Sequence, residues 1–265
     1  MLGFNGGLLG KRRVPTFDAS SGLWFPNEQS VARRELIWPG QYDSYFSSVS
    51  LLLNMDGSNG STVFTDSSSS AVTFTANGNA QISTTQSKFG GASGYFDGTG
   101  DSISTTTMTP FQFGTGDFTV ECWVYITSIG TYNAIIDTRS SGSFDNLTFG
   151  VWNAYNAGTL RLDHVSSYSG ARLTGSSTSV SLNTWTHIAW TRSGSTIACF
   201  VDGVKDATTV TNSGSLDSSG STAYIGQVID PNYLTGYIDD LRITKGVARY
   251  TANFTPPTAA FPTAG

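Results

Sequence analysis

Glutamate and histidine are scarce in this sequence. Residues 41–265 contain a single glutamate, Glu121, and the chain of 265 residues contains two histidines, His164 and His187. Glycoside hydrolysis needs two carboxylic side chains that flank the scissile bond, and two histidines without a ligating cysteine spacing give no transition-metal site. Both histidines are expected to be structural, His187 as a packed, hydrogen-bonded residue of "TWTHIAWTR". The sequence therefore predicts that the protein is not an enzyme.

Cysteine, basic residues and long apolar runs are scarce as well. Cys122 and Cys199 each lie in a strand-like run, which favours two buried thiols over a disulfide. No stretch approaches the roughly 20 apolar residues of a membrane span. The net charge of −5 and the pI of about 4.8 argue against nucleic-acid binding, because phosphate neutralisation needs clustered Lys and Arg.

The first 47 residues differ from the rest in charge and composition. Residues 1–40 hold five basic against three acidic residues, a balance of +2, so that the remaining residues carry −7. The apolar start precedes the basic triplet "KRR", whereas a secretion signal has the opposite order. A segment this short cannot bury its large apolar side chains against itself. We therefore expect residues 1–47 to form an arm that docks on another protein through Phe4, Leu8, Leu9, Lys11, Arg12, Arg13, Trp24, Phe25 and Trp38.

From residue 48 onward the sequence has the pattern of an all-β domain. Short runs that alternate apolar and polar residues are separated by turns rich in Gly, Asp and Asn. In "DFTVECWVYI" one face comprises Phe118, Val120, Cys122, Val124 and Ile126, and the other comprises Thr119, Glu121, Trp123 and Tyr125. Both faces can therefore be covered. Residues 48–265 are predicted to form a two-sheet antiparallel sandwich with a C-terminal extension.

Several of these runs, in their order, resemble the concanavalin A-like, laminin G-like jelly roll. They are "FTVECWVY", "NTWTHIAWTRSGSTIACFVDGV", "AYIGQ" and "GYIDDLRI", and the resemblance spans about Ser50 to Arg249. It implies an adjacent strand pair ending in a hairpin with Asp202 and Gly203 in the turn. The glucanases of this fold carry a catalytic strand with a Glu, a hydrophobic residue, an Asp and a later Glu. That motif is absent here.

The terminal segments resemble virion proteins of tailed bacteriophages that display one such domain. The residues concerned are "GFNGGLLGKRRVPT", "GLWFPNEQ" and "TKGVARYTANFTPPTAAFP". This resemblance implies a capsid decoration protein on the virion surface, assembled in the host cytoplasm and bound to the major capsid protein or another virion subunit. A homo-oligomer fits this role, because several arms strengthen attachment. The alternative is a receptor-binding module of a tail or head fibre that recognises host surface glycan.

No cofactor is required by this interpretation, but calcium stays open. Hard cations need oxygen ligands, and the resembling family often holds a calcium ion. The candidate ligands are Asp97, Asp101, Asp230 and Asp239, with Asp56 as a further contributor. The alternative is that these aspartates cap turns through the backbone, as Asp commonly does.

A glycan site is also open, because aromatic rings stack on sugar faces while polar side chains hold hydroxyl groups. Trp152, Tyr155 and Tyr168 lie in the turn-rich middle of the sequence, and Tyr233 lies in "DPNYLTG". Each of them could equally be a core or rim aromatic, since strand parity alone does not separate these roles.

The doublet in "GYIDDLRI" places two acids inside an apolar strand. If Leu241 and Ile243 point inward, strict alternation turns Asp239 inward as well and leaves Asp240 and Arg242 on the opposite, exposed face. Asp239 is then expected to tie this last strand to the backbone of a neighbouring loop or to calcium. Asp240 and Arg242 are expected to form an ordinary surface charge pair.

Overall fold

A computed structural model describes residues 42–129, 132–139, 146–152, 159–165, 172–175, 177–218, 220–228 and 232–265. The described residues contain two 3-10 helices, η2 (Phe46–Ser48) and η3 (Thr109–Phe111). The strands are β1 (Val49–Leu53), β2 (Thr75–Asn77), β3 (Gln81–Ser83), β4 (Ser93–Asp97), β5 (Ser102–Thr105), β6 (Phe118–Ser128), β7 (Tyr132–Asp137), β8 (Asn146–Trp152), β9 (Thr159–Val165), β10 (Arg172–Thr174), β11 (Trp185–Ser193), β12 (Thr196–Val201), β13 (Val204–Thr211), β14 (Ala223–Ile225), β15 (Gln227–Val228), β16 (Asn232–Tyr233) and β17 (Thr235–Lys245). No helix among these residues is long and apolar enough to cross a membrane.

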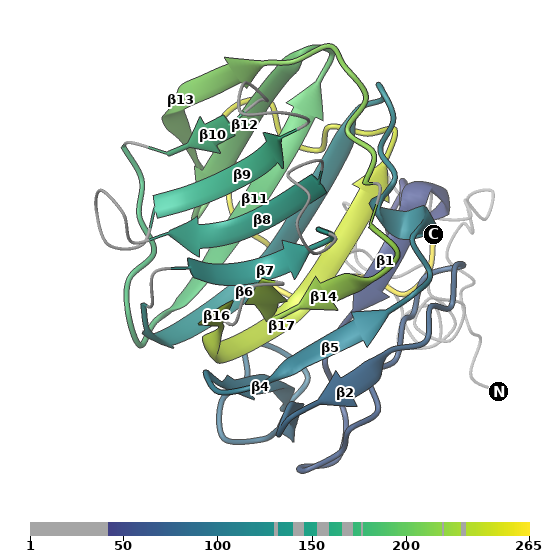
Figure 1. Ribbon diagram of the computed structural model, residues 1–265, viewed down its shortest axis with the longest axis vertical. Helices are drawn as coiled ribbons and strands as arrows, with labels where there is room; N and C mark the ends of the chain where they lie inside the picture. The colour runs from purple at the N-terminus through teal and green to yellow at the C-terminus, as the bar shows by residue number, and fades with distance from the viewer. Residues whose placement is uncertain are drawn as a thin grey trace, which may run out of the picture.

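Two antiparallel sheets pack face to face (Figure 1). The eight-stranded sheet has the order β13-β12-β11-β6-β17-β4-β3, and β1 also pairs with β17. The seven-stranded sheet has the order β10-β9-β8-β7-β14-β5-β2. This arrangement confirms the predicted all-β, two-sheet antiparallel sandwich.

The core lies between the two sheets and follows the predicted alternation. Every second residue of β6, from Phe118 to Ile126, belongs to one apolar cluster, together with Ile188 and Trp190 of β11. Cys122 and Cys199 are both free and both lie in this cluster, so the prediction of two buried thiols is confirmed. Burial raises the pKa of both thiols, which keeps them protonated and unreactive.

The hairpin between β12 and β13 has the predicted turn. Asp202 and Gly203 have positive φ values of 46° and 74°, which is the backbone of a two-residue hairpin turn. The Asp202 side chain also accepts a hydrogen bond of 2.9 Å from the His187 N–H on β11. One residue therefore closes the hairpin and fixes it to the adjacent strand.

The expected side-chain alternation of β17 is wrong at the acid doublet. Asp239 pairs with Trp123 and Arg242 pairs with Glu121, so β17 has one extra residue at this point, which is a β-bulge. Asp240 has a φ of 48° there, a conformation that Asp tolerates better than most residues. The bulge changes the parity, so that Ile238 joins the core with Leu241 and Ile243 and neither aspartate does.

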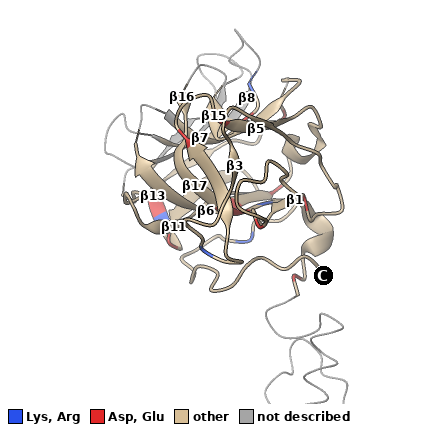
Figure 2. Ribbon diagram, turned by 90° about the horizontal axis from the view of Figure 1, so that it is seen from below, with Lys and Arg blue, Asp and Glu red and all other residues tan. Residues whose placement is uncertain are grey.

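Charged residues are few on the described strands (Figure 2). The outer face of the eight-stranded sheet, meaning the face turned away from the core, is partly covered by the C-terminal segment, residues 246–265. Tyr250 and Phe254 of this segment stack on each other at 3.6 Å and pack against Phe200 of β12. Farther along, Phe261 packs against Leu52 of β1. We call the part of the outer face beneath residues 246–265 the covered half and the remainder the uncovered half.

Candidate functional site

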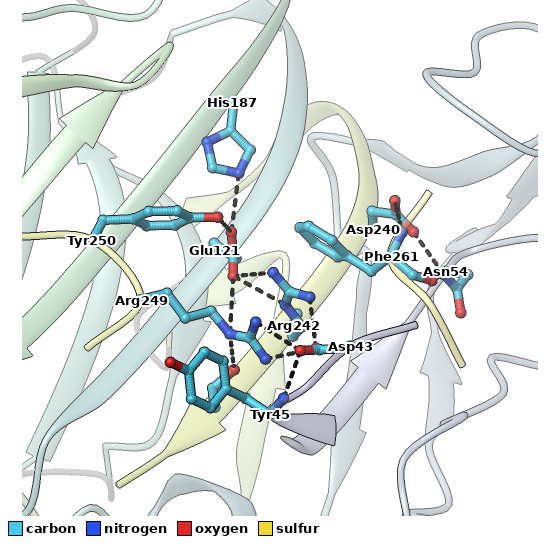
Figure 3. A network of polar contacts seen from close by, with 11 residues as sticks. Asp43, Tyr45, Asn54, Glu121, His187, Asp240, Arg242, Arg249, Tyr250 and Phe261 are labelled. Carbon is cyan, nitrogen blue, oxygen red and sulfur yellow. Dashed lines mark hydrogen bonds and ion pairs between the residues drawn. The ribbon is translucent and has the colours of Figure 1, made fainter. Parts of the chain in front are cut away.

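A buried ionic network lies on the outer face beneath the C-terminal segment (Figure 3). Arg242 of β17 is at its centre: its Nη2 donates to Glu121 Oε1 on β6 at 2.7 Å, and its Nη1 donates to Asp43 Oδ2 at 3.0 Å. Glu121 is fully buried and Arg242 is 4% exposed. Buried charges of this kind persist only where opposite charges and hydrogen bonds surround them.

Two residues of the C-terminal segment and one of β11 complete the network. Arg249 Nη2 donates to Asp43 Oδ2 at 2.6 Å, and the Tyr250 hydroxyl donates to Glu121 Oε2 at 2.8 Å. His187 Nε2 lies 3.3 Å from the same Glu121 oxygen. His187 is fully buried, as expected, but neither of its ring nitrogens makes the expected hydrogen bond among the described residues. The network thus joins the residues before β1, three neighbouring strands and the C-terminal segment.

The electrostatics of Glu121 exclude a catalytic role for this network. Burial by itself would raise the pKa of Glu121, but Arg242, His187 and Arg249 outweigh it and lower the pKa to about 2. Burial, and then Glu121 itself, raise the pKa of Tyr250, so its hydroxyl stays protonated and donates. An enclosed carboxylate with so low a pKa is neither a general acid nor a reachable nucleophile.

The network also brings the two ends of the described chain together. The Asp43 N–H donates to the Ala264 carbonyl at 3.0 Å, and Gly265 contacts Phe46. The Arg242 guanidinium lies 3.7 Å from the centre of the Phe261 ring. The chain therefore enters the sandwich beside its C-terminal end, and residues 42–47 of the expected arm pack on the sandwich.

The expectation that Asp240 and Arg242 form a surface pair is wrong. Asp240 is fully buried, and its carboxylate accepts hydrogen bonds from the Phe261 N–H at 2.8 Å and from Asn54 Nδ2 at 2.7 Å. It therefore holds the C-terminal segment against the end of β1. Burial raises its pKa to about 7.

Asp239 does tie β17 to a neighbouring loop, although it lies outside the core. Its Oδ2 accepts hydrogen bonds from the backbone N–H groups of Lys88 and Phe89, at 2.8 and 3.1 Å. Burial raises its pKa to about 7, and the nearby Asp56 adds to this effect. Its Oδ1 has no hydrogen-bond partner within the described residues.

The calcium candidates do not come together as one set. Asp97 and Asp101 are neighbours, but Asp101 accepts the backbone N–H groups of Asn79 and Asp97, and Asp97 accepts that of Thr99. Carboxylates that already face N–H donors act as turn caps and do not fit a cation. Among the residues that the structure describes, no three His, Cys, Asp or Glu side chains gather as for a metal. Asp239 keeps one oxygen without a hydrogen bond among the described residues, and Asp56 lies near it. Asp230 lies outside the described residues.

Most of the other candidate residues cannot be compared with the structure. The docking residues from Phe4 to Trp38, and Tyr155 and Tyr168, lie outside the described residues. Trp152 ends β8 and His164 lies in β9, with the backbone alone described. Tyr233 lies in the short strand β16 and is half-buried.

Sequence reasoning missed most of the network. Asp43, Arg249 and Tyr250 lie in segments that the sequence predicts to be an arm and an extension. Arg242 was predicted to be exposed because strict alternation does not account for the bulge of β17. One signal was available. Glu121 is the one charged residue between Phe118 and Ser128, and it alternates with apolar residues, which indicates an outer face that needs a cover.

Comparison with known proteins identifies the family. Residues 97–249, more than half of the chain, match the family model of the concanavalin A-like lectin/glucanases superfamily. The chain belongs to this superfamily. No curated protein matches the sequence.

Solved structures agree with the superfamily fold. Domain 4 of AbnA, an extracellular GH43 arabinanase from Geobacillus stearothermophilus solved with arabinotriose, is 16% identical, with a TM-score of 0.55 over 75% of this chain and 93% of that one. A botulinum neurotoxin type C structure, whose cell entry depends on two ganglioside molecules, is 13% identical, with a TM-score of 0.54 over 77% of this chain and 49% of that one. A Trypanosoma rangeli sialidase is 13% identical, with a TM-score of 0.50 over 75% of this chain and 31% of that one. At these identities the likeness establishes the fold alone.

Proposed function

We propose that this protein is a non-enzymatic structural protein of a tailed-phage virion, a capsid decoration protein that displays a lectin-like jelly roll on the virion surface. Residues 1–47 attach it to the major capsid protein or to another virion subunit. The observation that carries this proposal is the junction of the chain ends, where Asp43 bonds Ala264 and both arginines of the network. An arm that precedes this junction is attached to the sandwich at a place that hydrogen bonds and ion pairs hold together.

The non-enzymatic part of the proposal is supported by Glu121. It is the single glutamate of the sandwich, and it is enclosed, ion-paired and held at a low pKa. The superfamily contains lectins as well as glucanases, so a domain without catalytic carboxylates is consistent with membership.

The test is deletion of residues 1–40. We expect the shortened protein to stay soluble and folded, with an unchanged unfolding midpoint, because the network begins at Asp43. It should no longer join the particle when it is expressed during infection. A full-length variant with Lys11, Arg12 and Arg13 changed to Ala is the matched control for the basic part of the arm. Particles that still incorporate the deleted form would sink the proposal.

The alternative is a receptor-binding module of a tail or head fibre that recognises host surface glycan. An uncovered row of aromatic residues on the outer face, described below, favours glycan recognition. Imaging of intact particles labelled at this protein separates head from tail. A glycan array with and without a chelator separates a binding module from a purely structural one, because only the former gives a signal.

A further inference from the structure

Four aromatic side chains form a straight row across the uncovered half of the outer face. Tyr95 of β4 pairs with Tyr237 of β17, which pairs with Tyr125 of β6, which pairs with Trp185 of β11. Along the row, the ring centres lie 4.9, 5.9 and 5.6 Å apart. We call these four residues the aromatic row. It runs perpendicular to the strands, with one ring on each of four neighbouring strands.

The row is distinct from the core and from the covered half of the face. Tyr95, Tyr125 and Trp185 are half-buried, and Tyr237, between its neighbours, is 9% exposed. The Trp185 Nε1 donor has no hydrogen-bond acceptor among the described residues. Burial, and then Tyr95 and Tyr125, raise the pKa of Tyr237, so its phenol group stays uncharged. The Trp185 Nε1 is itself buried, so the row offers flat apolar rings together with phenol hydroxyl groups.

A second copy of this chain is a poor occupant for this surface. Half-buried aromatic rings of this size together expose no more than about 400 Å². A stable interface buries about 800 Å² on each partner. The surface cannot readily be widened on the side of β11 and β12, because Tyr250 and Phe254 already cover Ala189 and Phe200 there.

The shape and chemistry of the row fit a sugar chain. Neighbouring strands lie about 4.8 Å apart, so four rings span about 14 Å, the length of a short oligosaccharide. Sugar rings present apolar C–H faces that stack on aromatic rings and hydroxyl groups that pair with neutral donors and acceptors. The row itself contains no acid or base, which favours a neutral ligand over an anionic one.

We propose that the aromatic row binds a neutral, extended oligosaccharide that lies across β4, β17, β6 and β11 with its sugar rings stacked on the aromatic rings. This inference rests on the glycan-recognition part of the proposed function and is independent of attachment through the arm. It also differs from the aromatic residues that the sequence suggested, of which Tyr233 lies outside the row.

The test uses the full-length protein on an array of immobilised neutral oligosaccharides of graded length. Trp185→Ala and Tyr125→Ala should each weaken binding about tenfold, which corresponds to about 1.4 kcal/mol. Trp185→Phe should keep most of the binding, because the ring remains. Tyr224→Ala is the matched control: it removes a half-buried tyrosine from β14 of the other sheet and should leave binding unchanged. A chelator should have no effect, because the row contains no cation ligand.

Four results would overturn this proposal. Three of them are an array without signal, equal loss of binding in Tyr224→Ala, and binding restricted to charged glycans. A fourth is a dimer in solution that Trp185→Ala converts to monomers, since the row would then be an interface between copies. None of these results changes the expected outcome of deleting residues 1–40. Failure of the oligosaccharide-binding proposal can therefore be distinguished from failure of the attachment proposal.

Discussion

The two halves of one sheet face are built in opposite ways. Under the C-terminal segment, the outer face carries ions that are enclosed, paired and beyond the reach of any ligand, with Arg242 and Glu121 at the centre. In the aromatic row, the same three strands, β6, β11 and β17, together with β4 carry aromatic rings that the chain leaves partly open. The covered half gives the sandwich a fixed junction for its two described ends, and the open half is where we propose that an oligosaccharide binds. The comparison shows that coverage by the C-terminal segment, rather than the polarity of the outward side chains, gives one half its structural role.

The largest effect should come from Arg242→Ala in the covered half. The change leaves Glu121 and Asp43 buried with too few opposite charges, so we expect a loss of about 3–5 kcal/mol in the free energy of unfolding. Urea unfolding at neutral pH measures it. Lys245→Ala, which removes a half-buried lysine at the end of the same strand together with its hydrogen bond to the Thr109 carbonyl, is the control and should cost about 1 kcal/mol. Similar losses for the two variants would remove the distinction between the halves.

A smaller loss in the free energy of unfolding is expected for Phe261→Ala, which removes packing of the C-terminal segment rather than a charge of the ionic network. Phe261 is 4% exposed and packs on Leu52, with the Arg242 guanidinium on its ring. Removal of a buried Phe side chain costs about 3 kcal/mol. Thermal unfolding measures the loss, and Val204→Ala at a half-exposed position of β13 is the control. An unfolding temperature that Phe261→Ala leaves unchanged would show that packing of the C-terminal segment does not stabilise the sandwich.

The free energy of unfolding should depend on pH through two groups of carboxylates. One makes stability rise with pH in the acid range, and the other makes it fall as the pH approaches 7. Glu121 has a folded pKa of about 2 against its ordinary 4.5, so its contribution is present above pH 4.5 and is lost as the pH falls to about 2. That shift corresponds to about 3 kcal/mol. Unfolding midpoints of the wild type and of Glu121→Gln across this range test it, and the variant should lack the rise in the acid range.

The second group is the acid doublet. Asp239 and Asp240 have folded pKa values of about 7 against an ordinary 3.8, so both take up protons on folding between these values. Stability should therefore fall as the pH rises from 3.8 to 7. Asp239→Asn should remove about half of this fall in the same measurement. An unchanged slope would show that Asp239 titrates normally.

The smallest stability effect is expected in the open half. Tyr125→Ala truncates a half-buried ring on the outer face and should cost only about 1 kcal/mol, while it weakens oligosaccharide binding. Urea unfolding beside the array experiment tests both parts. A loss as large as that of Arg242→Ala would place the row with the structural half.

The sequence predicted the sandwich well because alternation is a local property. Each residue of β6 points where its parity places it, and the Asp-Gly turn at Asp202 follows from residue type. The acid doublet was predicted wrongly for a related reason. A single bulge residue, Asp240, reverses parity, and no local pattern in "GYIDDLRI" marks where the extra residue lies.

The sequence by itself determined the all-β fold, the inward face of β6, the buried thiols and the shortage of glutamate, because these depend on residue type and on neighbours along the chain. The tertiary structure alone decided which outward residues meet. Asp43 and Arg249 are far apart in sequence, as are Tyr95, Tyr125, Trp185 and Tyr237, and they become neighbours only through the strand order and register of one sheet. Pairing between distant strands is set by the packing of the whole sandwich, and this is why neither half of the outer face could be predicted from the sequence.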